Sequence, residues 1–164
     1  MFEVDACNLP IGLLGRHPEE FYGAMGRIVC ICAVLEDKVA SLRHALVRVQ
    51  QGRFTHEPTS AQIKTSRRLS RDLPDPAPSL IGAFLGRAQV AFDRRNELVH
   101  SSFPAQASGR IWGHRAAREK SVTDGSTDTV VTSVEEMGAF IRELATLVWD
   151  FNHVYAWSAS TPAP

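Results

Sequence analysis

The sequence has no excess of either charge, no long hydrophobic run and few cysteines, and each shortage excludes a class of protein. The 18 basic and 18 acidic residues cancel to a net charge of zero, which excludes both a strongly basic nucleic-acid-binding tail and an acidic solubilising protein. No apolar stretch approaches the roughly 18 residues that a membrane-spanning helix needs. With 164 residues, 44% of them hydrophobic, the chain fits one globular domain, which we place at residues 1–157.

The N-terminus and the cysteines indicate a cytoplasmic protein. Glu3 and Asp5 stand ahead of any apolar run, which does not suit a secretory signal. The three cysteines, Cys7, Cys30 and Cys32, are odd in number, and the last two would point about 200° apart on a helix. We expect the cysteines to fill the core in a reducing compartment, and we expect no metal site and no cofactor.

Two long helices are predicted by apolar stripes with alternating spacings of three and four residues. The first lies between Pro18, typical of a first helical turn, and Gly52, which ends it near residue 51. Its stripe consists of Phe21, Met25, Ile28, Cys32, Leu35, Val39, Leu42, Leu46 and Val49. The last helix opens with a capping box of Ser133 and Glu136. Its stripe consists of Val134, Met137, Ile141, Leu144, Val148, Phe151 and Tyr155.

A shorter helix is predicted from an N-cap at Thr59 or Ser60 to about residue 72, with Ile63 and Leu69 as its core contacts. The four cations of this helix recur at spacings of three and four, which gathers them on one side: Lys64, Arg67, Arg68 and Arg71. Such a side is either a solvated face or a face that contacts phosphate.

A third helix and a hairpin complete the predicted fold. After a connector with three prolines, the helix runs from about Ser79 to His100. Residues 110–115 and 128–132 are β-prone, and the turn signal Asp124-Gly125 lies between them. The fold class is therefore all-α, a bundle of about four helices with a small β-hairpin inserted before the last helix. Residues 158–164 are expected to form a disordered tail.

The end of the third helix places chargeable side chains beside core positions. Arg95 lies three residues after Phe92 and seven after Ala88, so it continues the apolar stripe. A guanidinium there requires a partner or a cleft, because an unpaired buried charge is strongly unfavourable. Asn96 and His100 are four residues apart on one face, which would allow the amide to orient the imidazole.

The six residues from Arg95 to His100, RNELVH, resemble the R-x4-H signature of the HEPN family, including the polar residue after the arginine. Members of that family are helical bundles with the motif near the end of a central helix. The resemblance implies a metal-independent endoribonuclease that acts as a homodimer, commonly as the toxin of a toxin–antitoxin pair or in another defence system. It implies RNA as substrate, a cognate antitoxin protein as partner, and Arg95, Asn96 and His100 as catalytic residues.

This chemistry suits the residue types. In RNA cleavage through the 2′-hydroxyl, His100 would move a proton to or from the attacking or leaving oxygen. Arg95 would stabilise the added negative charge on the phosphorane as a bidentate donor. One motif holds one histidine, so a dimer would supply both the acid and the base.

The segment after the motif carries a local surplus of positive charge. Its four fixed cations stand against Glu119 alone, and Trp112 lies among them, so the segment would hold an RNA strand by phosphate contacts and stacking. An exposed hairpin with scattered charges explains the pattern equally well. The predicted RNA-binding residues are Arg94, Arg110, Trp112, His114, Arg115 and Arg118.

Three alternatives to catalysis stay open. In the first, Arg95 pairs with an acidic residue such as Glu36 or Asp37 and His100 caps its helix. In the second, the chain is a non-catalytic helical interaction module, whose apolar stripes form a surface for a partner protein. In the third, the same arginine and histidine bind a nucleotide phosphate without cleaving it.

Overall fold

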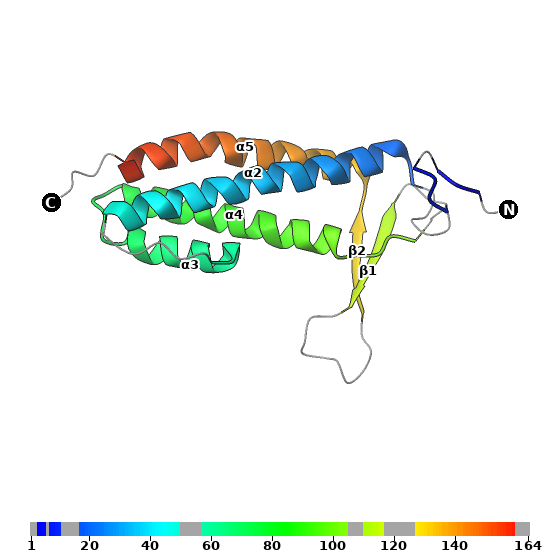
Figure 1. Cartoon of the computed structure of the whole chain (residues 1–164), viewed down its shortest axis with the longest axis horizontal. Coiled ribbons are helices and arrows are strands. Elements are labelled where there is room, and N and C mark those ends of the chain that lie inside the picture. The colour runs from blue at the N-terminus through cyan, green and yellow to red at the C-terminus, as the bar shows by residue number, and fades with distance from the viewer. Residues whose placement is uncertain are drawn as a thin grey trace. The chain divides into compact units, whose positions relative to one another are not determined.

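A computed structural model describes residues 3–5, 7–10, 17–49, 57–104, 110–116 and 127–159 (Figure 1). The elements follow the chain as α2 (Glu19–Val49), α3 (Thr59–Ser70), α4 (Ala77–Val99), β1 (Ile111–Ala116), β2 (Thr127–Thr132) and α5 (Val134–Ala159). The prediction of a helical bundle with one hairpin before its last helix is therefore confirmed. Within the described ranges, no helix combines the length and the apolar content that crossing a membrane requires.

The chain divides into two compact units, and each of the three long helices contributes to both. Unit 1 comprises Met1–Val29 and Arg94–Ile141, and it includes the hairpin and the last turns of α4. Unit 2 comprises Cys30–Asp93 and Arg142–Pro164, and it includes α3. The single domain expected over residues 1–157 stays a prediction.

The apolar stripes of α2 and α4 supply buried residues to both units. In unit 2, α2 buries Leu35 and Leu42, and α4 buries Ile81 and Leu85. In unit 1, α2 buries Phe21, Ala24 and Ile28, and α4 buries Leu98. The stripe predicted for α2 is confirmed for its described side chains, which are all buried except Met25, and Met25 is half-buried.

The stripe predicted for α5 is wrong in part. Its buried residues are Met137, Phe140, Leu144, Leu147, Phe151 and Val154. The predicted members Val134, Ile141 and Val148 are half-buried, and Tyr155 is exposed. Two adjacent rows of α5 are apolar, so spacings of three and four fit both rows and do not reveal which one faces the core. The capping box is confirmed at its serine, because the Glu136 backbone N–H donates to Ser133 Oγ at 3.1 Å.

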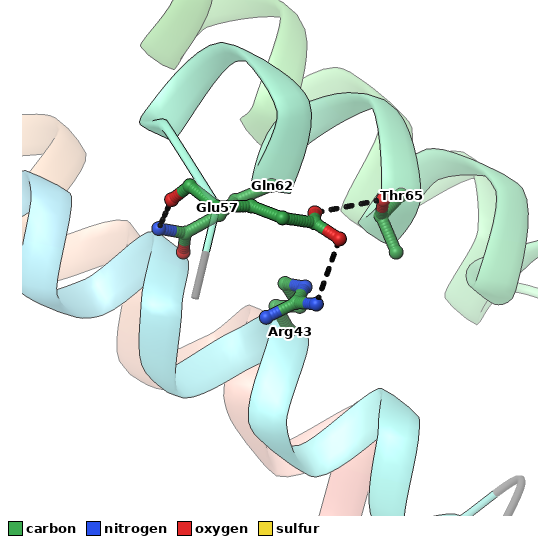
Figure 2. A network of polar contacts seen from close by, with 4 residues as sticks. All are labelled: Arg43, Glu57, Gln62 and Thr65. Carbon is green, nitrogen blue, oxygen red and sulfur yellow. Dashed lines mark hydrogen bonds and ion pairs between the residues drawn. The ribbon is translucent and has the colours of Figure 1, made fainter. Parts of the chain in front are cut away.

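α3 begins differently from its prediction. Pro58 occupies the N-cap and no side chain caps the helix, so neither Thr59 nor Ser60 is the N-cap. A side-chain bond instead connects the first turn to the residue before the proline, because the Gln62 Nε2 donates to the Glu57 carbonyl at 2.7 Å (Figure 2). The predicted core contacts of this helix are buried, together with two serines: Ile63, Ser66, Leu69 and Ser70.

A buried ion pair connects α3 to α2. Arg43 of α2 is only 2% exposed, and its Nη2 lies 3.1 Å from Glu57 Oε1. The other carboxylate oxygen of Glu57 accepts a hydrogen bond from the Thr65 hydroxyl at 3.2 Å. Figure 2 shows the Glu57 carboxylate between the Arg43 guanidinium and α3.

Two further expectations are corrected. α4 begins at Ala77, so Pro78 lies in its first turn and not in the connector; a first turn tolerates proline because its N–H groups have no helical acceptor. α5 continues through Ser158 and Ala159, which the sequence assigned to the tail. Residues 160–164 of that tail, and the turn Asp124-Gly125, lie outside the described residues.

The cysteines do not all fill the core. Cys32 is buried as predicted, but Cys7 and Cys30 are exposed. Cys30 lies two positions before the buried row of α2, so it points away from that row.

Candidate active site at the end of α4

Arg95 and Asn96 lie in the last turns of α4, and His100 comes directly after the last residue of that helix, Val99; all three belong to unit 1. Arg95 and Asn96 are half-buried, and His100 is exposed. The Nε atom of Arg95 is itself buried, which agrees with a guanidinium that continues an apolar stripe. The helical pattern extends to the histidine, since the His100 N–H donates to the Asn96 carbonyl at 3.1 Å.

The expected side-chain bond between Asn96 and His100 does not form. In the part of the chain that the structure describes, the two residues are joined by their main chains only. An exposed imidazole without that constraint is accessible to a substrate.

The chain immediately after His100 is fixed onto the hairpin. Ser102 and His114 form an antiparallel bridge in which each N–H donates to the other's carbonyl at 2.9 Å. This bridge connects the end of α4 to the middle of β1. His100 is two residues upstream of it, so the candidate catalytic histidine is held close to the strand that carries Trp112 and His114.

An aromatic cluster packs against the connection between α4 and β1. The Phe103 ring packs against Phe21 with ring centroids 5.4 Å apart, and its carbonyl accepts a hydrogen bond from His17 Nε2 at 2.8 Å. A Cβ atom at Gly113 would lie 2.5 Å from Phe103 Cε1. Glycine is therefore required in β1 where the ring crosses the strand.

The opposite face of the hairpin is exposed and partly apolar. Because side chains alternate along a strand, Trp112 and His114 share one face of β1, and both are exposed. Their cross-strand partners are Val131 and Thr129, respectively. Trp112 is 40% exposed and Val131 42% exposed, so an indole and a valine are presented together beside an imidazole.

The predicted positive surplus of the hairpin is compensated in its described part. The Arg115 Nη2 lies 3.1 Å from Asp128 Oδ2, the carboxylate of its cross-strand partner. Arg110 is exposed and lines a depression of about 560 Å³ together with Glu135 and Glu136. Arg118 lies outside the described residues. Direct phosphate contacts by Arg110 and Arg115 would therefore compete with acidic neighbours.

Arg94 is engaged with α5 rather than presented to a ligand. Its Cζ atom lies 4.4 Å from the centroid of the Phe140 ring, and its Nη2 donates to the Glu136 carbonyl at 3.5 Å. These contacts favour a packing role for Arg94 through a cation–π interaction.

Two polar residues with structural importance were missed in the sequence. Arg43 is four residues after Val39 and three before Leu46, the same signal that singled out Arg95. His17 gave no signal, because its acceptor is a backbone carbonyl 86 residues away.

The arrangement brings together Arg95 and Asn96 at the end of α4 with His100 directly after it. The main-chain bridge between Ser102 and His114 holds β1 near them. A guanidinium and an imidazole can stabilise and protonate a reacting phosphate. Among the described residues, no group of three or more His, Cys, Asp or Glu side chains is placed to hold a metal ion. Comparison of the chain with protein-family models, with curated proteins and with solved structures finds no match.

Proposed function

We propose that the chain is a HEPN-like, metal-independent endoribonuclease that acts as a homodimer, with Arg95 and His100 as its catalytic pair and Asn96 beside them. One observation carries the proposal. A half-buried guanidinium lies in the last turns of α4 and an exposed imidazole directly after it, and a main-chain bridge connects that helix end to a strand with an exposed tryptophan and histidine. The proposed role as a toxin or defence nuclease follows from the same family resemblance.

The proposed reaction uses the 2′-hydroxyl of RNA as the nucleophile. Its oxygen forms a bond to the adjacent phosphorus while a base removes its proton, and the bond from phosphorus to the 5′-oxygen breaks as an acid protonates that oxygen. The products are a 2′,3′-cyclic phosphate and a 5′-hydroxyl. Arg95 stabilises the charge on the phosphorane, and His100 of each protomer supplies the acid or the base.

The outer face of the hairpin is the proposed contact for the RNA strand. Trp112 offers a surface on which a base stacks, and His114 offers a hydrogen-bonding group two residues along the same face. This assignment keeps two of the six residues predicted to bind RNA as the main contacts.

A second candidate function is a non-catalytic module that binds a partner protein, such as an antitoxin. The observation that favours it is the exposed pair of Trp112 and Val131, which are cross-strand neighbours. Exposed aromatic residues of this kind are enriched at protein interfaces.

The test is cleavage of a fluorescent mixed-sequence RNA in EDTA by the wild type, Arg95→Ala and His100→Ala. Arg142→Ala and His153→Ala are matched controls, since both residues are exposed and lie on α5. We expect each site variant to lose about 100-fold or more in rate, the controls to keep wild-type rates, and the products to carry cyclic-phosphate ends.

Retained folding and dimerisation of every variant would be checked by circular dichroism and light scattering. Absence of cleavage by the wild type on several RNAs and at several pH values would contradict the nuclease and favour the binding module. Equal loss in the site variants and in the controls would contradict the residue assignment.

A further inference from the structure

A second concentration of positive charge lies on α3, in unit 2, and includes none of the residues assigned above. An open depression of about 610 Å³ is lined by all four cations of this helix, Lys64, Arg67, Arg68 and Arg71, and by Glu57, Ser60, Ala61, Ile63, Thr65 and Gln89. We call it the α3 basic depression. Its four cations are exposed.

These cations differ from those of the hairpin because their charge is not compensated. Glu57 is the one acidic residue among the lining residues, and its carboxylate is bound to the buried Arg43 at 3.1 Å. Within the described ranges, Lys64, Arg67, Arg68 and Arg71 form no ion pair. Four positive charges therefore face solvent around one concavity.

The cations lie on a helix whose opposite side is packed into unit 2. Ile63 and Leu69 are buried on its inner side, and the Arg43–Glu57–Thr65 network connects its first turns to α2 (Figure 2). The Arg67 Nη2 lies 3.5 Å from where a Cβ of Gly86 would be, so this guanidinium extends across α4. A ligand would meet charges on a helix that is already packed in place, and binding would not have to order the backbone that carries them.

The row matches the spacing of a nucleic-acid strand. Residues 64 to 71 span about 10 Å of helix at 1.5 Å per residue, and a strand in a duplex carries one phosphate per roughly 3.4 Å of axis. Three of the four cations are guanidiniums, which bind phosphate oxygens bidentately. The hydroxyls of Ser60 and Thr65 lie in the same lining.

The lining also limits the kind of ligand. It contains no aromatic residue, so bases have no platform on which to stack. The exposed large hydrophobic residues of the described chain include none on α3, so this helix has no apolar group to insert into a lipid surface. A hydrophilic polyanion contacted through its backbone fits both facts.

We infer that the α3 basic depression binds the phosphate backbone of a nucleic-acid strand, without regard to base sequence. The inference rests on the proposed function in taking RNA as the strand that the depression holds. It predicts that affinity comes from α3, whereas cleavage comes from the end of α4.

The test measures fluorescence anisotropy of a labelled single-stranded RNA with the full chain carrying His100→Ala, so that bound RNA stays intact. In this background, Arg67→Gln/Arg71→Gln is compared with Arg48→Gln/Arg142→Gln, a control that removes two exposed arginines elsewhere. We expect roughly tenfold weaker binding for the α3 pair. Its salt slope should fall by about 1.4, that is about 0.7 for each lost contact, and the control should stay within about twofold of the parent.

Equal affinities of the two double variants would overturn the inference. So would displacement of the RNA by poly-glutamate as effectively as by unlabelled RNA of equal charge, because the depression would then fit an acidic protein. DNA of the same sequence should lose the same factor, since the inferred contacts are with phosphate groups, which RNA and DNA share. If the wild type does not cleave RNA but the α3 pair still loses binding, the nuclease fails and this inference stands.

Discussion

Arg43 and Arg95 each continue the apolar stripe of a helix, yet the two side chains have different environments. Arg43 is almost fully buried and ion-paired to Glu57, whereas Arg95 is half-buried. Spacing alone identifies both positions, because a cation in phase with core residues violates the pattern. It does not identify Glu57, which lies beyond the end of α2 and pairs with Arg43 only through the tertiary fold.

Removing the carboxylate of Glu57 leaves a buried cation without its principal partner. We expect Glu57→Gln to lower the free energy of unfolding by about 2–3 kcal/mol. This loss lies at the lower end of what breaking a buried ion pair costs, because Glu57 is itself 29% exposed. Urea denaturation followed by circular dichroism measures the change.

The matched control is Asp150→Asn, which breaks an ion pair of 2.7 Å between the more exposed Arg87 and Asp150. Such a pair contributes about 0.5 kcal/mol or less. A Glu57→Gln effect no larger than that of the control would show that Arg43 does not depend on Glu57.

Among the elements, the hairpin shows which features the sequence predicts and which it does not. Its β-prone segments predict both strands to within two residues, because the alternation and the β-branched residues are local signals. The register is not local, and it is the register that places Asp128 opposite Arg115 and removes one cation from the predicted RNA contact. The choice between the two apolar rows of α5 has the same origin, since only packing decides it.

The docking of β1 depends on the absence of a side chain at Gly113. Gly113→Ala would force the Phe103 ring away from the strand, and we expect a loss of about 1–3 kcal/mol of stability, as for other overpacked sites. Thermal unfolding measures the loss.

Gly82→Ala is the control, because nothing lies within 4 Å of a Cβ there and the residue is inside α4. This change should stabilise the chain by up to about 1 kcal/mol. Gly113→Ala and Phe103→Ala together should cost less than the sum of the two single changes. Strict additivity would contradict the contact.

At the scale of the whole molecule, a net charge of zero conceals an uneven distribution. The sequence located both basic segments, but their relative importance depends on which cations meet carboxylates in the fold. Asp128 neutralises Arg115 on the hairpin, while the one carboxylate in the α3 basic depression is turned to a buried arginine. Electrostatic attraction of RNA is therefore expected to be local and strongly dependent on salt.

The proposed catalysis also requires the association of two chains. Each motif holds one catalytic histidine, whereas the reaction needs both an acid and a base, so the motif of a second chain is proposed to supply the other group. We expect light scattering to give twice the 18.1 kDa of one chain. The cleavage rate per chain should stay constant at high concentration and fall in proportion to concentration once dilution separates the dimer. A monomeric mass combined with undiminished activity per chain on dilution would contradict the shared site. His114 would then be the candidate for the second imidazole, because its main chain is bridged to Ser102, two residues after His100.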